Sequence, residues 1–316
     1  MSLVFDRTHW ALILGGSSGF GLATARGLAR RGMNVAIAHR DRRGAMPAIE
    51  REFQDIRETG VGFLSVNVDA LATEGRASIL EALAAAMGDR GRVRLLMHSI
   101  AFGNLKPIAP VAPATQPVAR TRARLAEALG VSPEALGQAI QAVANTGGAD
   151  ALYALCDPPD LDPDLLLEEE DFARTVHAMG TSLAAYTQAL FSLKLFAADA
   201  RVLAMTSEGN EVAWRGYAAV SAAKAALESV SRSIAREFGP HGVRSNIVQA
   251  GITDTPALRL IPGSDGMKAD ARVRNPLGRL TTPDDVADVI CLLCTDEARW
   301  MNGSIVRVDG GERIAR

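Results

Sequence analysis

The sequence predicts an α/β fold in which a doubly wound parallel sheet of about seven strands is covered by helices on both faces. Apolar strand-like runs alternate with helix-like segments, and a glycine-rich loop follows the first of these runs. Such alternation is typical of parallel strands joined by right-handed crossovers. No repeat of solenoid period appears. We therefore expect a single domain over residues 1–316, interrupted by one long insertion at 103–168 that follows the fourth strand.

Seven segments read as strands because they are short, apolar and bounded by turn residues. They are residues 11–14, 34–39, 61–68, 94–102, 201–207, 244–251 and 303–311. Six further segments have apolar residues at helical spacing. These are residues 22–32, 48–60, 79–88, 171–196, 217–238 and 283–294. The order of the two kinds of segment is what predicts the doubly wound sheet.

Composition excludes several classes of protein. A hydrophobic content of 48% supports a full core, and a formal net charge of −2 gives no general attraction to nucleic acid or to an anionic membrane. No window reaches the roughly 18 apolar residues of a membrane span. The cysteines, Cys156, Cys291 and Cys294, are too few for a disulfide framework, and the CxxC pair lies on a helical apolar face. We expect a soluble, cytoplasmic protein whose paired cysteines pack in the core.

The insertion at 103–168 holds eight of the fourteen prolines. A connection of this length inside a domain is seldom without structure. Ser132 before Pro133 is a good helix start, and Gly130 and Gly147 are good stops, so a helical hairpin is expected. Its second helix carries no arginine or lysine, which argues against DNA binding. A lid or wall for the ligand and an interface with a second chain are both open interpretations.

The loop GGSSGFG at 15–21 stands where the first strand turns into the first helix. Glycines at such a turn let a diphosphate approach the amide hydrogens of a helix N-terminus. The sequence therefore predicts dinucleotide binding on a sheet of the Rossmann type. The residues expected at the diphosphate are Gly15, Ser17, Ser18, Gly19, Phe20 and Gly21.

The end of the second strand bears on which dinucleotide is bound. His39 stands where enzymes that prefer NAD usually carry an acid, and the chain continues with Arg40, Asp41, Arg42 and Arg43. Guanidinium groups bind a 2′-phosphate bidentately, which favours NADPH over NADH. The alternative is a solvated basic loop, in which Asp41 partly offsets the arginines.

With its GxxxGxG loop spacing, the chain resembles the short-chain dehydrogenase/reductase family. The resemblance covers residues 8–102 and 169–313 and includes the closing VDGG at 308–311. Family members are usually tetramers, so the resemblance implies a homo-oligomer.

Within that family the chain looks most like the enoyl-acyl-carrier-protein reductases of fatty acid synthesis. MHSIAF at 97–102 stands in place of an NNAG-like sequence, Tyr217 and Lys224 keep a YxxxxxxK spacing, and QAGITDT at 249–255 lacks the usual proline before its glycine. The resemblance implies reduction of an enoyl thioester, carried by acyl carrier protein or coenzyme A.

The Tyr217–Lys224 spacing has a physical interpretation. Seven residues are about two helical turns, so the phenol is about 10 Å from the lysine along the axis instead of about 6 Å for a spacing of four. In an enoyl thioester the hydride reaches the β-carbon while charge develops on the more distant thioester oxygen, and a set-back phenol suits that oxygen. Lys224 is expected to bind the nicotinamide ribose. Ser207 either assists the oxyanion or satisfies backbone groups. A purely structural Tyr217 and a surface Lys224 are the alternative.

The resemblance also implies further contacts with the cofactor. Adenine is expected beside Asn67 and Val68, and the nicotinamide half beside Lys224 and two strand ends. Those ends contribute Ser99, Ile100, Ala101, Ile252, Thr253 and Thr255. His98 is expected to be a packed residue, because a lone histidine at a strand end seldom acts as an acid or base. No spacing predicts a metal site.

Two other functions stay open at this point. One is a carbonyl or 3-ketoacyl reductase with motifs like those of enoyl reductases. The other, from a different class, is a catalytically idle NADPH-binding protein that regulates or interacts through its insertion.

Overall fold

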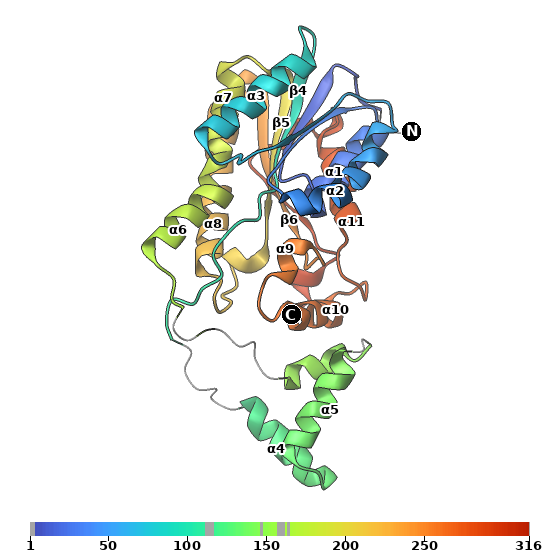
Figure 1. Cartoon of the computed structure of the whole chain (residues 1–316), viewed down its shortest axis with the longest axis vertical. Helices are drawn as coiled ribbons and strands as arrows, with labels where there is room; N and C mark the ends of the chain where they lie inside the picture. The colour runs from blue at the N-terminus through green and yellow to red at the C-terminus, as the bar shows by residue number, and fades with distance from the viewer. Residues whose placement is uncertain (1–3, 111–116, 146–147, 157–161, 163–164, 316) are drawn as a thin grey trace.

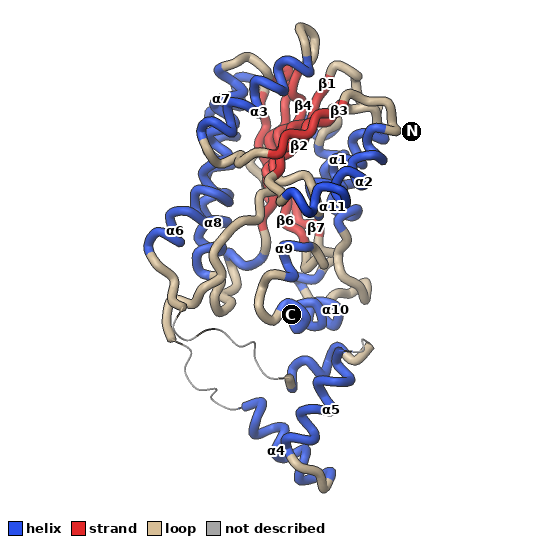
Figure 2. The backbone as a smooth tube through the Cα atoms, viewed as in Figure 1, coloured by secondary structure: helices blue, strands red, loops and turns tan. Residues whose placement is uncertain are grey.

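The fold is a seven-stranded, all-parallel sheet between two layers of helices. The computed structural model describes residues 4–110, 117–145, 148–156, 162 and 165–315. The strand order is β3-β2-β1-β4-β5-β6-β7. The strands lie between the helices in Figure 2. The strands are β1 (His9–Leu14), β2 (Asn34–His39), β3 (Phe63–Asn67), β4 (Arg92–His98), β5 (Phe196–Thr206), β6 (Val243–Ala250) and β7 (Ile305–Val308). The predicted doubly wound sheet of seven strands is confirmed.

Each face of the sheet has its own core. Alternation along β1 sends Ala11 and Ile13 to one face and Leu12 and Leu14 to the other, and all four are fully buried. The first face is covered by α1 (Gly19–Arg30), α2 (Met46–Arg57) and α11 (Pro283–Leu293). The second is covered by α3 (Thr73–Met87), α7 (Ser182–Ser192) and α8 (Ala218–Phe238), on the opposite side in Figure 1.

The strand order reverses between β1 and β4. Leu14 at the end of β1 pairs with Ala38 of β2 on one side and His98 of β4 on the other. The segments that follow β1 and β4 turn to opposite faces of the sheet. This opens a crevice beyond the carboxyl ends of the two strands. The candidate site lies at this edge.

The insertion forms the expected helical hairpin. Helix α4 (Pro117–Leu129) is joined to α5 (Pro133–Asn145) at Gly130, which has a φ of +67°, and the Ser132 hydroxyl accepts the Ala135 amide at 3.1 Å. The stop predicted at Gly147 falls outside the described residues. The hairpin lies beyond α10 (Ser264–Arg274), away from the sheet (Figure 1).

A short 3-10 helix connects the hairpin to the rest of the fold. It covers Asp150–Leu155 and packs on α10. The Asp150 carboxylate accepts the Arg272 guanidinium through both oxygens, with Nε to Oδ2 at 2.9 Å. This ion pair ties the insertion to α10.

Several boundaries differ from the sequence prediction. The fourth strand ends at His98, and the following SIAF turns away as loop. The predicted helix at 171–196 is two helices, α6 (Glu169–Val176) and α7, separated by a π-helical turn at His177–Thr181. Phe196 instead begins β5, because it pairs with Val93 of β4.

Two further differences lie near the site. Tyr217 is the N-cap of α8, with φ −106° and ψ 3°, so the helix starts one residue later than predicted. Helices α9 (Pro256–Arg259) and α10 follow β6 where no helix was predicted. The described part of the chain contains no helix long and apolar enough to span a bilayer.

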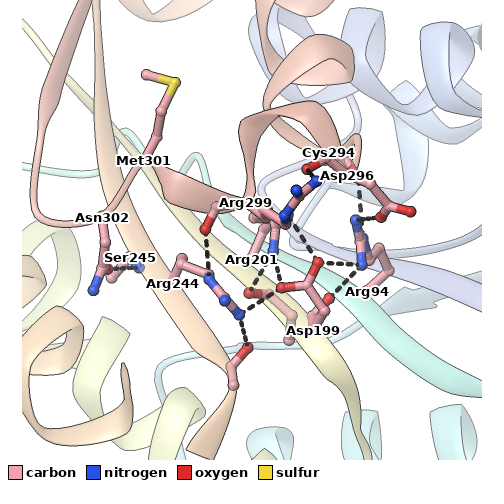
Figure 3. Close-up of polar contacts among 12 residues, drawn as sticks. Arg94, Asp199, Arg201, Arg244, Ser245, Cys294, Asp296, Arg299, Met301 and Asn302 are labelled. Carbon is pink, nitrogen blue, oxygen red and sulfur yellow. Dashed lines mark hydrogen bonds and ion pairs between the residues drawn. The ribbon is translucent and has the colours of Figure 1, made fainter. Parts of the chain in front are cut away.

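An arginine cluster ties three strands to α11 at the sheet edge opposite the site (Figure 3). Arg94, Arg201 and Arg244, from β4, β5 and β6, all bind the Asp199 carboxylate. Arg201 also donates to the Leu293 carbonyl at 3.0 Å, and Arg94 likewise binds a carbonyl at the end of α11. Cations at a helix C-terminus satisfy its free carbonyls and its dipole.

Asp199 is therefore a sensitive position for stability. Burial alone would raise its pKa, but hydrogen bonds and charge from Arg201, Arg94 and Arg244 outweigh burial and lower the pKa below 3.8. A carboxylate whose pKa is lower in the folded state than in the unfolded state stabilises the fold. This stabilisation is complete at a pH above the pKa of the unfolded state. That contribution is lost as the pH falls through the lowered value.

We predict that Asp199→Ala lowers the free energy of unfolding by about 3 kcal/mol, because Arg201 is 1% exposed and would lose its charge partner. Urea unfolding at neutral pH measures the loss. Asp288→Ala is the matched control, since that carboxylate pairs with Arg31 but is 68% exposed, and it should cost less than about 1 kcal/mol. Equal losses in the two variants would contradict the assignment.

Candidate active site

A cavity of about 550 Å³ opens at the carboxyl ends of the strands. Its wall combines residues from the loops after β1, β2, β4, β5 and β6 with residues of α8 and the C-terminal segment. Most of the residues predicted from sequence line it. They are Gly15, Ser17, Ser18, Gly19, Phe20, Arg40, Ser99, Ile100, Ala101, Ser207, Tyr217, Lys224, Ile252, Thr253 and Thr255. Gly21, Asn67 and Val68 do not.

The glycine loop is shaped by close backbone contacts. Gly15 has a φ of +84°, and a Cβ there would lie 2.7 Å from the Ser99 carbonyl oxygen. A Cβ on Gly21 would lie 2.2 Å from the Gly15 oxygen, so Gly21 packs the loop and does not face the cavity. Ser18, the N-cap of α1, makes no side-chain hydrogen bond to the helix. The first amides of α1 thus face the cavity without a side-chain cap, an arrangement that fits the diphosphate of a dinucleotide.

The loop after β2 is held by Asn67. Its side-chain oxygen accepts the Asp41 amide at 2.9 Å, and its amide nitrogen donates to the Asp41 carbonyl at 3.1 Å. The Asp41 carboxylate lies 2.8 Å from His39 Nδ1. Asn67 therefore positions this turn through its side chain, while Val68 packs against the apolar core.

Arg40 and Asp41 both line the cavity, whereas Arg42 and Arg43 do not. The Arg40 guanidinium donates to Asp69 at 2.7 Å and lies 5.1 Å from the centre of the Phe102 ring. The wall at the end of β2 thus offers one guanidinium and one carboxylate to a ligand.

Ser207, Tyr217 and Lys224 all line the cavity. The hydroxyls of Ser207 and Tyr217 lie 3.5 Å apart, and Lys224 Nζ donates to the Met205 carbonyl at 2.8 Å. Burial raises the pKa of Tyr217, which the hydrogen bond from Ser207 partly offsets. The phenol is therefore protonated at neutral pH and can donate a hydrogen bond.

Lys224 is buried yet close to an acid one turn further along α8. Burial lowers its pKa to about 8, and the Glu228 carboxylate opposes that change. The same carboxylate accepts Thr206 Oγ1 at 2.8 Å and Asn210 Nδ2 at 2.6 Å. Glu228 thus supports the charge of Lys224 and holds the loop that carries Ser207.

His98 does not face the cavity. It is fully buried, with Nε2 2.8 Å from the Ser182 hydroxyl, and Ser182 itself donates to the Ala178 carbonyl. Burial and the nearby Lys224 charge lower the pKa of His98 to about 3, so the ring is neutral. Its place in the fold is that of a packed residue. The described residues contain no group of three side chains suited to a metal ion.

Two models of known protein families match the chain. Residues 134–312 match the model described as enoyl-(acyl carrier protein) reductase, and residues 9–121 match the model described as short chain dehydrogenase. The first match alone covers more than half of the chain.

The chain belongs to the short-chain dehydrogenase/reductase family.

Individual relatives match this chain over different shares of its length. A 1-cyclohexenylcarbonyl-CoA reductase from Streptomyces collinus is 26% identical over 98% of this chain and 88% of its own. A (3R)-3-hydroxyacyl-CoA dehydrogenase from Rattus norvegicus is 32% identical over 46% of this chain and 56% of its own.

Solved structures share the fold. A short-chain dehydrogenase from Burkholderia cenocepacia, in complex with NADP, has a TM-score of 0.68 at 22% identity and covers 99% of this chain and 100% of its own. A 3-ketoacyl-(acyl-carrier-protein) reductase from Brucella melitensis, complexed with NADH, has a TM-score of 0.64 at 23% identity, over 96% and 98% of the two chains.

Glu312 is a cavity residue that the sequence analysis missed. Its carboxylate accepts the Ile252 amide at 3.1 Å and so holds the loop after β6. Burial raises the pKa of Glu312 to about 6. The sequence places this acid directly after the closing VDGG. Its contact with Ile252 could not be predicted, because the two residues are far apart along the chain.

We predict that Gly15→Ala weakens binding of the nicotinamide cofactor at least tenfold, because the added Cβ strains a positive φ and displaces the Ser99 carbonyl in the cavity wall. Fluorescence titration with NADPH measures the change. Gly44→Ala is the control, since nothing lies within 4 Å of a Cβ at that position. Unchanged affinity in Gly15→Ala, or an equal loss in Gly44→Ala, would show that the loop does not receive the cofactor.

Proposed function

We propose that this protein reduces the carbon–carbon double bond of an enoyl thioester, using NADPH. One observation carries the proposal: the phenol in the cavity belongs to Tyr217, seven residues before Lys224, while Val220, four residues before it, also lines the cavity. No phenol stands at the nearer position. The other tyrosines are elsewhere, Tyr186 bonded to the Ala70 carbonyl and Tyr153 beside Gly266.

The position of the phenol distinguishes two reductions. In a carbonyl reduction the oxygen that becomes the alcohol is bonded to the carbon that takes the hydride. In reduction of an enoyl thioester the hydride goes to the β-carbon and the electron pair moves to the thioester oxygen, further along the substrate. A donor set back from Lys224 suits the second arrangement, because catalysis requires donors where charge develops.

Bound NADPH supplies the hydride. The protonated Tyr217 hydroxyl donates a hydrogen bond to the thioester oxygen and stabilises the enolate, whose α-carbon then takes a proton from water to give the saturated thioester. Ser207 lies close enough to orient the phenol or to share the oxyanion. Lys224, anchored on the Met205 carbonyl and with its charge supported by Glu228, would bind the nicotinamide ribose, set apart from the oxyanion at Tyr217.

The preference for NADPH rests on Arg40. Its guanidinium lines the cavity at the end of β2, where a 2′-phosphate is recognised in folds of this type. Asp41 is the competing feature, since a carboxylate there favours the ribose hydroxyl of NADH. The contact with His39 engages one Asp41 oxygen, and the contact with Asp69 engages one Arg40 nitrogen, so both groups keep polar atoms for a ligand. Only the guanidinium attracts a 2′-phosphate, and this charge is the basis for proposing NADPH.

Named relatives support an acyl thioester as the substrate class. The relative from Streptomyces collinus, which is aligned over almost the whole chain, is a reductase of an unsaturated acyl-CoA. Carbonyl reduction is the second candidate, favoured by the 3-hydroxyacyl-CoA dehydrogenase relative and by the Ser207–Tyr217 contact, which would equally serve a ketone oxygen.

We predict that Tyr217→Phe lowers kcat for an enoyl-CoA by about 10²–10³, the cost of removing one oxyanion donor. The consumption of NADPH measures the rate, and NADPH titration checks that cofactor binding is kept. Tyr153→Phe serves as the control because it removes a phenol that does not line the cavity. A Tyr217→Phe variant with a rate near that of the unmodified protein would exclude this role.

A further inference from the structure

A second cavity of about 300 Å³ lies next to the main one. Four residues line both cavities: Glu208, Trp214, Ile252 and Met267. Residues that face two cavities form the wall between them. The main cavity is therefore separated from an adjoining space by a few side chains.

Trp214 is the largest side chain of this wall. Its ring meets the Tyr217 ring edge to face, with centres 5.3 Å apart and planes at 74°. Gly209 permits this packing, because a Cβ there would lie 2.4 Å from the Tyr217 ring and 3.0 Å from the Trp214 ring. The indole also packs on both apolar clusters of this region, one around Val220 and one around Ile252. Trp214 thus packs directly against the ring of Tyr217.

The second cavity is lined by both apolar and charged residues. Val212 adds an apolar side chain that does not line the main cavity. The charges present are grouped: Arg274 donates to Asp270 at 2.8 Å and to Glu208 at 3.4 Å. Glu312 accepts from the same guanidinium at 3.5 Å, and three carboxylates around one guanidinium disfavour an anionic ligand. The other lining residues, Val212, Trp214, Ile252 and Met267, are apolar and suit an uncharged alkyl chain.

We propose that Trp214 limits the length of the acyl chain that the protein accepts, by closing the main cavity off from the second one. This inference rests on the proposed enoyl-thioester reduction. A short acyl group bound at Tyr217 ends against the indole. A longer chain requires the space that the indole closes, so removal of the indole connects the two cavities.

The test compares crotonyl-CoA with trans-2-decenoyl-CoA in Trp214→Ala. The ratio of kcat/KM for the long substrate to kcat/KM for the short one is expected to rise about tenfold or more, the effect of one or two methylenes gained by an apolar pocket. Trp214→Phe keeps a ring against Tyr217 and should give a smaller rise. Trp300→Ala, at a side chain that is 93% exposed, is the control for loss of a tryptophan.

A second substitution separates a specific opening from a general loosening of the fold. Val212→Phe in the Trp214→Ala background refills the second cavity and is expected to return the ratio toward its original value. A loosened fold would not be corrected by that change. Calorimetric binding of butyryl-CoA and decanoyl-CoA, which cannot be reduced, gives the same comparison without turnover.

The outcomes are distinct. If the unmodified protein accepts crotonyl-CoA and Trp214→Ala leaves the chain-length ratio unchanged, or if Val212→Phe fails to reverse a rise, the role given to Trp214 is wrong while the proposed function stands. If the unmodified protein neither binds nor reduces any of these thioesters, the proposed function is wrong and this inference falls with it.

Discussion

The common direction of the seven strands is the constraint on which the rest of the structure depends. Because every strand ends at the same edge, the loops carrying Gly15, Arg40, Ser99, Ser207 and Ile252 are brought together although they are far apart in sequence. The opposite edge holds the strands in place, where three arginines on Asp199 join β4, β5 and β6 to the end of α11. Ion pairs therefore hold β4, β5 and β6 together at one end of the strands. The loops at the opposite, carboxyl ends form the site.

Helix α10 connects the insertion to the loops that line the cavity. Arg272 on α10 binds Asp150 of the insertion, and Arg274, half a turn later, reaches Glu208 and Glu312. Glu208 follows Ser207 directly, and Glu312 holds the Ile252 amide. Of the described residues of the insertion, only Gly103 and Leu105 line the main cavity. The described helical hairpin packs on the 3-10 helix Asp150–Leu155, which packs on α10, and the hairpin does not form the cavity wall.

The sequence predicted what depends on local patterns. Strand and helix alternation predicted the sheet, the glycine spacing predicted the turn into α1, and the Tyr217–Lys224 spacing identified two residues that line the cavity. Asn67, Glu228 and Glu312 could not be assigned their contacts in this way, because each binds a residue distant in sequence. The same limit applies to α10, whose polar sequence has little apolar periodicity and whose packing depends on the insertion.

The most direct measurement is oxidation of NADPH by the purified protein with crotonyl-CoA and, separately, with acetoacetyl-CoA. The set-back phenol predicts oxidation with crotonyl-CoA and little or none with acetoacetyl-CoA. Oxidation with acetoacetyl-CoA alone would mean that Tyr217 serves a carbonyl oxygen, which would contradict the assignment of the reaction. Oxidation with neither, despite tight binding of NADPH, would contradict it in another way and indicate a binding protein without this catalysis.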